Sequence, residues 1–210
     1  MMDEFNTADA TTDTGGSDVI DTMYEWIAHE QPKERFDSVT QYMMYRWNDS
    51  AFKYAASFQV ETGYGSRANN DRWICACVKF SIASDVDLND ARLATFMHLA
   101  GNHFSLVNDL ASFEKETQEF QSGEAAFVIN VVDVLQRQHG IDVREAKAKA
   151  YSMQLEMENH IEEDLEQLKK RDLLSLEEWR FVNAVVVMLG GHVFYCMTAS
   201  RYGGEKSRIT

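Results

Sequence analysis

The chain has 210 residues, enough for one domain with a substantial core, and 45% of them are hydrophobic. A single proline and eleven glycines leave few helix breakers, which is typical of a mostly helical protein. The formal net charge of −14 argues against nucleic acid and anionic membranes as main partners, because both are polyanions.

The N-terminal third combines a polar segment with an aromatic-rich one. Residues 1–17 are small, polar and acidic and predict a flexible leader, and residues 18–30 have a helical pattern. Residues 33–60 form a long amphipathic stretch with many aromatics, and residues 61–72 carry turn residues that predict a loop. Residues 72–84 are short and apolar, and their helical surroundings favour a helix over a strand.

The next two segments also predict helices. Residues 85–120 run without proline, and Asp87 or Asn89 can cap the start of this helix by accepting hydrogen bonds from free N–H groups. Residues 123–140 predict a helix that ends at Gly140.

The C-terminal part predicts two long helices and a short tail. Residues 141–172 form a charged amphipathic pattern. Residues 173–204 are the most apolar segment, so we expect this helix to be central, and Ser175 with Glu178 forms a capping-box pattern at its start. The prediction is therefore one all-α domain of six or seven helices over residues 18–204, followed by a tail at residues 205–210.

The three cysteines are expected to be free. Cys75, Cys77 and Cys196 cannot all pair within one chain, which favours reduced thiols in a cytoplasmic protein. Cys75 and Cys77 lack a second ligand pair in register, so buried free cysteine is a better interpretation than a metal site. The polar, acidic start does not fit a signal peptide, and without a run of about eighteen apolar residues we expect no membrane span.

Three oxygen-bearing side chains, Asn108, Ser112 and Glu116, recur every four residues within the predicted helix at 85–120. On a helix they lie along one stripe of about 12 Å. Their oxygens are hard donors of the kind that magnesium prefers, and magnesium is usually held by one or two carboxylates together with substrate phosphates. The stripe emerges from an apolar run, which favours a site over an exposed polar face. Lys115 lies beside Glu116 and could reach a phosphate as a point charge.

The pattern N-D-L-x-S-x-x-K-E around these residues resembles the second metal-binding motif of class I terpene synthases, in the form common among fungal enzymes. The later segments NVVDVL and GIDVREAKAKA, and a final apolar helix that ends in Arg201 and Tyr202, follow in the order of that family's C-terminal half. The resemblance implies an isoprenoid synthase helical bundle in which Asn108, Ser112 and Glu116 bind one Mg²⁺ of a family set of three.

The resemblance also implies residues that would hold a diphosphate. Arg201 and Tyr202 match the family's terminal Arg-Tyr pair, which reaches the diphosphate when the site closes. YRWNDS, residues 45–50, resembles the sensor–linker–effector segment, with Arg46 as sensor, Asp49 as linker and Ser50 as effector in place of the usual glycine. Lys115 would complete the diphosphate-binding set. The spacing from Arg46 to the metal motif is longer than the family pattern predicts.

An apolar lining would shape the substrate and shield carbocations. Tyr195 stands where the family often has tryptophan, and its aromatic face could stabilise a cation. The candidate lining residues, which could equally be ordinary core residues, are Trp47, Phe104, Met188, Phe194 and Tyr195.

The aspartate-rich motif of the family does not occur upstream of Arg46, and the resemblance covers about residues 35–204. We therefore expect a fold truncated at the N-terminus, with a second chain or fragment that supplies the aspartate-rich helix, or a homodimer. The expected activity is that of a sesquiterpene cyclase, a carbon–oxygen lyase acting on phosphates, which ionises a linear isoprenyl diphosphate, farnesyl diphosphate first, with Mg²⁺. Two alternatives stay open: a shortened synthase-like protein that holds an apolar ligand or has altered chemistry, and a non-catalytic scaffold that binds a partner.

Overall fold

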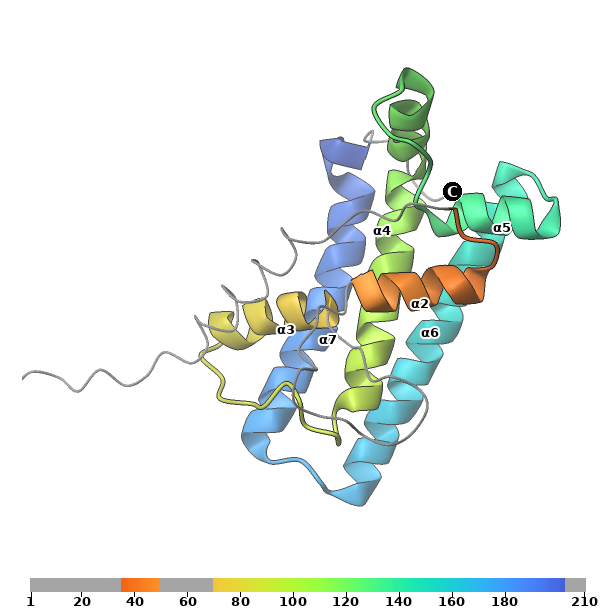
Figure 1. Cartoon of the computed structure of the whole chain (residues 1–210). Coiled ribbons are helices and arrows are strands. Elements are labelled where there is room, and N and C mark those ends of the chain that lie inside the picture. Colours follow the sequence, from red (N-terminus) through yellow and green to blue (C-terminus); the bar gives the residue numbers. More distant parts are fainter. Residues whose placement is uncertain (1–34, 50–69, 203–210) are drawn as a thin grey trace, which may run out of the picture.

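The computed structural model describes residues 35–49 and 70–202, which form an all-α bundle without strands in these two ranges (Figure 1). This confirms the predicted fold class. The helices are α2 (Val39–Asp49), α3 (Asn70–Ser81), α4 (Ala94–Ser122), α5 (Val131–His139), α6 (Val143–Arg171) and α7 (Leu176–Thr198), followed by the short 3₁₀ helix η1 (Ser200–Tyr202).

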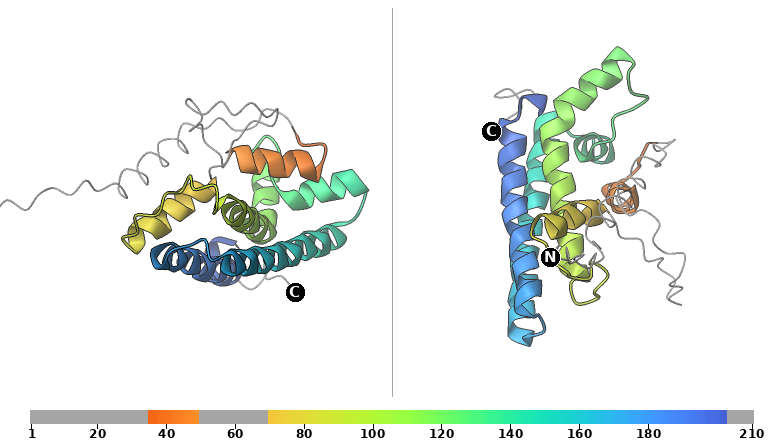
Figure 2. Two further views of the ribbon diagram at one scale, coloured as in Figure 1. Left: turned by 90° about the horizontal axis from the view of Figure 1, so that it is seen from below. Right: turned by 90° about the vertical axis from the view of Figure 1, so that its left-hand side faces the viewer.

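Helix α4 is the centre of the bundle. It packs against every other α-helix described, most extensively against α6 and α7. Figure 2 shows α6 and α7 on one side of α4 and α2 and α3 on the other. Three apolar clusters fill the interior of the described part. One joins α3, α4, α6 and α7, another joins α2, α4, α5 and α6, and a smaller one joins α4, α7 and η1.

The prediction that the most apolar helix is central is wrong, because α7 packs with one face only. Phe181, Val182 and Val185 are buried, whereas Val187 and Phe194 are exposed on the outward face. By length and composition alone, α7 could cross a membrane. A single helix of this kind is weak evidence, so the absence of a membrane span stays a prediction.

The predicted helix over residues 123–140 is correct only in its second half. Gly123 has a φ of 82° and ends α4, with its N–H bonded back to Phe120 O. Helix α5 begins at Val131, because the side chain of Asn130 accepts a hydrogen bond from the N–H of Val132. Gly140, at a φ of 63°, ends α5 as predicted.

The helix ends confirm one predicted cap and contradict another. Ser175 and Glu178 form both hydrogen bonds of the capping box at the start of α7. Helix α4, in contrast, begins without a side-chain cap. Asp87 instead accepts a hydrogen bond from the N–H of Asn89 at 2.9 Å, which stabilises a turn several residues before the helix.

Several predictions concern residues outside the described part. The leader at residues 1–17, the helix at 18–30, Ser50 and the tail at 205–210 belong to this group, as do the side chains of Trp47 and Asp49. The helix predicted over residues 72–84 is confirmed by α3, which begins at Asn70, within the predicted loop at 61–72, and ends at Ser81. Residues 61–69 of that loop lie outside the described part. Cys75, Cys77 and Cys196 form no disulfide with one another, as expected.

Candidate metal and diphosphate site

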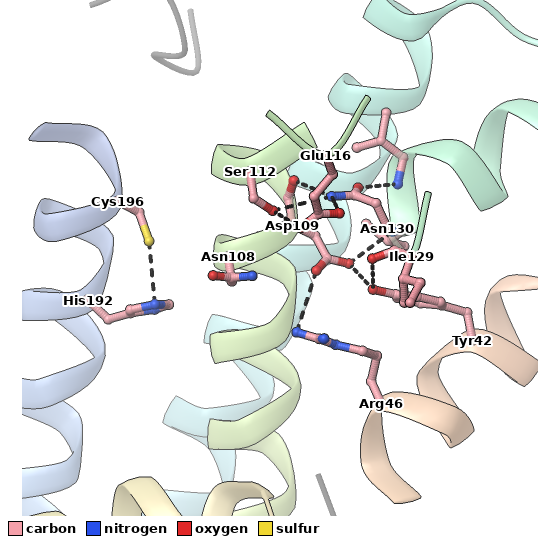
Figure 3. Close-up of polar contacts among 12 residues, drawn as sticks. Tyr42, Arg46, Asn108, Asp109, Ser112, Glu116, Ile129, Asn130, His192 and Cys196 are labelled. Atoms are coloured by element: carbon pink, nitrogen blue, oxygen red, sulfur yellow. Dashed lines mark hydrogen bonds and ion pairs between the residues drawn. The ribbon is translucent and has the colours of Figure 1, made fainter. Parts of the chain in front are cut away.

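The oxygen stripe follows α4 where this helix passes the start of α5 (Figure 3). Helix α4 also packs against η1. Ser112 is buried, and its Oγ donates a hydrogen bond to Glu116 Oε1 at 2.7 Å. One turn earlier, Asn108 is half-buried, and its Oδ1 accepts a hydrogen bond from the Tyr202 hydroxyl at 3.0 Å. The helical spacing thus places an amide, a hydroxyl and a carboxylate oxygen in succession along the helix.

Glu116 is a carboxylate in an environment that disfavours its charge. Its Oε2 accepts a hydrogen bond from Asn130 Nδ2 at 3.2 Å. Burial, and then the nearby negative charge of Asp109, raise the pKa of Glu116 to about 7, although the hydrogen bonds from Ser112 and Asn130 act in the opposite direction. A group of positive charge at this position would relieve both unfavourable effects.

Asp109 faces away from the stripe, towards α2 and α5. Its Oδ2 accepts hydrogen bonds from the Tyr42 hydroxyl and, at 2.9 Å, from the N–H of Val131. Its Oδ1 lies 3.6 Å from Arg46 Nη2. Burial raises the pKa of Asp109, and the charge of Arg46 acts against this shift. The predicted diphosphate sensor therefore lies next to the oxygen stripe, on the neighbouring helix α2 (Figure 3).

The other predicted diphosphate ligands differ in their surroundings. Tyr202 is buried at the end of the described chain, where its hydroxyl contacts the stripe. Arg201 is exposed, and its guanidinium carbon lies 5.8 Å from the centroid of the Tyr202 ring. Lys115, next to the stripe, forms an ion pair of 2.5 Å with Glu119, which lies one turn further along α4.

The predicted apolar lining is not brought together as one surface. Phe104 is a buried residue of α4 whose ring lies 4.6 Å from that of His192. Tyr195 packs edge-on against Tyr202, with ring centroids 6.1 Å apart. Phe194, in contrast, is 69% exposed on the outward face of α7. Met188, also on α7, is exposed as well, and the Trp47 side chain lies outside the described residues.

Comparison with known proteins decides the family. Residues 19–159, more than half of the chain, match the family described as terpene synthase family 2, C-terminal metal binding. The chain belongs to the terpene synthase family. The predicted resemblance to the C-terminal region of fungal class I terpene synthases is thereby confirmed.

Several fungal terpene synthases are similar to parts of the chain. Phomopsene synthase of Phomopsis amygdali is 33% identical over 49% of this chain and 14% of its own length. A bifunctional sesterterpene synthase of Aspergillus aculeatus is 28% identical over 55% of this chain and 16% of its own. Macrophomene synthase of Macrophomina phaseolina is 23% identical over 90% of this chain and 24% of its own. The chain thus spans a quarter or less of these relatives.

Two residues of this candidate site were not predicted from the sequence. Tyr42 lies one helical turn before Arg46, so the spacing of four residues is a signal that places both on one face of α2. Asn130 precedes an apolar run, as helix-capping residues often do, but the interpretation of residues 123–140 as one helix obscured this signal.

The residues of the stripe fit a divalent cation of the family's metal-binding type. Asn108, Ser112 and Glu116 offer neutral and anionic oxygens, the donors that Mg²⁺ takes. The described residues contain no cluster of three or more His, Cys, Asp or Glu side chains suited to a metal. A metal site in this part of the chain therefore depends on the amide and hydroxyl oxygens of the stripe as well as on Glu116.

Proposed function

We propose that this chain carries the metal- and diphosphate-binding part of a terpene cyclase that acts on a linear isoprenyl diphosphate. The observation that carries the proposal is the partly buried Ser112–Glu116 hydrogen bond of 2.7 Å, next to the Arg46–Asp109 pair of 3.6 Å. An oxygen set for a cation and a guanidinium for a phosphate then lie side by side, which is the combination that diphosphate chemistry needs.

Asn108, Ser112 and Glu116 would hold one divalent cation, which we take to be Mg²⁺ because all three donors are hard oxygens. When bound, the ion would neutralise negative charge on the leaving diphosphate. We further propose that the other metal ions of the family set require an aspartate-rich helix from another part of a synthase or from a second chain.

The chain's own cations would bind and orient the diphosphate. The Arg46 guanidinium, fixed by Asp109 from one side, presents a planar fork of donors suited to phosphate oxygens. Arg201 extends from the same turn as Tyr202, and the Tyr202 hydroxyl orients the Asn108 amide. Lys115 would have to leave Glu119 to take part.

The substrate proposal starts from farnesyl diphosphate and extends to longer chains. One relative is by name a sesterterpene synthase, which widens the range of isoprenyl lengths worth testing. A second candidate function, binding of an apolar ligand or partner without catalysis, is favoured by the exposed apolar side chains of α7, such as Val187 and Phe194.

The test is turnover by the purified chain, alone and together with the aspartate-rich part of a related synthase, with Mg²⁺ and farnesyl, geranylgeranyl or geranylfarnesyl diphosphate. Turnover is measured as diphosphate release, and the products are identified by gas chromatography. We expect Asn108→Ala with Glu116→Ala to abolish turnover. The matched control is Asn159→Ala with Glu166→Ala, both exposed on α6, which should turn over like the wild type. Undiminished turnover by the site variant would contradict the metal assignment. A wild-type chain that binds the substrates but stays inactive even with the aspartate-rich part added would favour the second candidate function.

A further inference from the structure

Asn130 connects the start of α5 to the oxygen stripe of α4. The residue is 0% exposed, and its carboxamide divides its contacts between the two helices. The Oδ1 atom accepts a hydrogen bond from the N–H of Val132 at 3.0 Å and so caps α5. The Nδ2 atom points to the opposite side, towards α4 (Figure 3).

The Nδ2 group lies within reach of three oxygens of the stripe region. It donates to the backbone carbonyl of Asp109 at 2.8 Å and to Glu116 Oε2 at 3.2 Å, and Ser112 Oγ is 3.5 Å away. Glu116 therefore receives one hydrogen bond on each carboxylate oxygen, from Ser112 on Oε1 and from Asn130 on Oε2. The two donors come from different helices, so together they restrict the rotation of the carboxylate.

We propose that Asn130 is a positioning residue of the metal site, which holds the Glu116 carboxylate in the orientation that faces Ser112. This inference rests on the proposed function, in which Glu116 is a ligand. Partners that hydrogen-bond to metal ligands fix the orientation of those ligands, and their loss typically lowers metal affinity about 10–100-fold. Asn130 also bonds the α4 backbone next to Asn108, so it fixes the stripe and α5 relative to each other.

The competing explanation is that Asn130 only caps α5. The two roles use different atoms, Oδ1 for the cap and Nδ2 for the stripe, and can therefore be separated. Serine is as good a capping residue as asparagine, but it is shorter and has no amide to reach Glu116. Asn130→Ser should therefore retain the cap and remove the contact with the stripe.

The experiment measures Mn²⁺ binding by the full chain in the presence of inorganic diphosphate, using the electron paramagnetic resonance signal of free Mn²⁺. We expect Asn130→Ser to weaken Mn²⁺ binding about 10–100-fold at a temperature where the variant is folded. The matched control is Asp142→Ser, because Asp142 caps α6 by accepting from Glu145 N–H at 2.8 Å and forms part of no stripe contact. This control should bind Mn²⁺ like the wild type.

Each outcome decides the inference. If Asn130→Ser binds Mn²⁺ as tightly as a wild type that does bind, the positioning role is wrong and the proposed function stands. If the wild type binds no Mn²⁺ under these conditions, the proposed function is contradicted, and the inference falls with it. Should Asn130→Ser fail to fold, the Asn130 side-chain amide signals of the wild type provide the test by nuclear magnetic resonance. These signals should shift on addition of Mg²⁺ and diphosphate, and unchanged signals would overturn the proposal.

Discussion

Among single residues, Asp109 is the carboxylate of α4 that contacts both neighbouring helices at the site, α2 and α5. It is buried in α4, and it takes hydrogen bonds from Tyr42 of α2 and from the first N–H of α5, with Arg46 nearby. Removing a partner from a buried charge is strongly destabilising, because the remaining charge has lost its compensation. The stability of the α2–α4 contact should therefore depend on these few polar groups.

Tyr42→Phe tests this dependence. The substitution removes the hydroxyl that donates to Asp109 and leaves the ring in the core, so we expect the free energy of unfolding to fall by about 1–3 kcal/mol. Urea denaturation measures the change. Tyr151→Phe, at an exposed position of α6, is the matched control and should change stability by less than about 0.5 kcal/mol. Equal effects at both positions would show that the Asp109 contact contributes nothing.

His192 gives the chain a pH dependence of its own. It lies on α7 against the Phe104 ring, with Nε2 3.4 Å from Cys196 Sγ. Burial, followed by the charge of His103 on α4, lowers the pKa of His192 from 6.5 to about 4. Between these two pH values the unfolded chain binds a proton that the folded chain does not bind. The contribution of His192 to stability is therefore present above pH 6.5 and is lost as the pH falls towards 4.

His192→Phe should remove this contribution. The free energy of unfolding of the wild type minus that of the variant should increase from pH 4 to pH 6.5. The increase should stay below the limit of about 1.4 kcal/mol per pH unit for one proton, since His192 is partly exposed. Urea denaturation at several pH values provides the measurement. The contributions of the other titrating groups are common to both proteins and cancel when the two free energies of unfolding are subtracted. Gln167→Phe, at an exposed position of α6 that carries no titrating group, should show no such trend. A difference that is constant with pH would refute the assignment.

At the scale of the helices, the sequence predicts a helix end correctly where the signal for that end lies within a few residues of it. The Ser175–Glu178 capping box and the glycine at 140 each stop or start a helix through contacts within a few residues. Residues 123–140 were misjudged because their apolar pattern resembles a helix, although Gly123 belongs to the end of α4 and Asn130 to the start of α5. Periodicity alone does not locate such a boundary.

The candidate site shows the same division between local and tertiary information. The spacing of Asn108, Ser112 and Glu116 on one helix could be predicted, because it depends only on helix geometry. The hydrogen bonds from Asn130 and Tyr42 could not, because they depend on how α5 and α2 pack against α4. The apolar lining was the least predictable part, since an apolar residue of a helix can face the core, a cavity or the surface.

Replacing glycine by alanine should have opposite effects on stability at the end of a helix and in its interior. Gly140 has a φ of 63°, where an alanine Cβ is strained, so Gly140→Ala should destabilise the chain by about 1–2 kcal/mol. Gly191 lies within α7, and an added Cβ would meet nothing within 4 Å. Gly191→Ala should therefore stabilise the chain by about 0.5–1 kcal/mol. Urea denaturation of both variants should give changes of opposite sign, and a neutral Gly140→Ala would contradict the role of Gly140 as a helix end.

At the scale of the whole chain, the apolar surface is concentrated on one helix. Seven of the fourteen large hydrophobic side chains that are exposed in the described residues belong to α7, which lies at the outside of the bundle (Figure 2). Large exposed apolar patches on single domains usually mark a contact surface. The chain also spans a quarter or less of the relatives compared above. It therefore matters whether, in the folded species that carries the site, the outward face of α7 is exposed to solvent or covered by another chain.

Two valines of α7 answer this question by a matched substitution. Val185 is 0% exposed and Val187 is 75% exposed, and both lie in the middle of the same helix. Val185→Ser should lower the free energy of unfolding by at least about 2 kcal/mol, since it removes a buried apolar side chain and buries a hydroxyl. Val187→Ser should change it by less than about 0.5 kcal/mol if the face is open. The loss of helix propensity is the same in both variants and cancels in the comparison. Urea denaturation over a range of protein concentrations distinguishes the cases: a large loss at Val187 would show that another chain covers this face in the folded species.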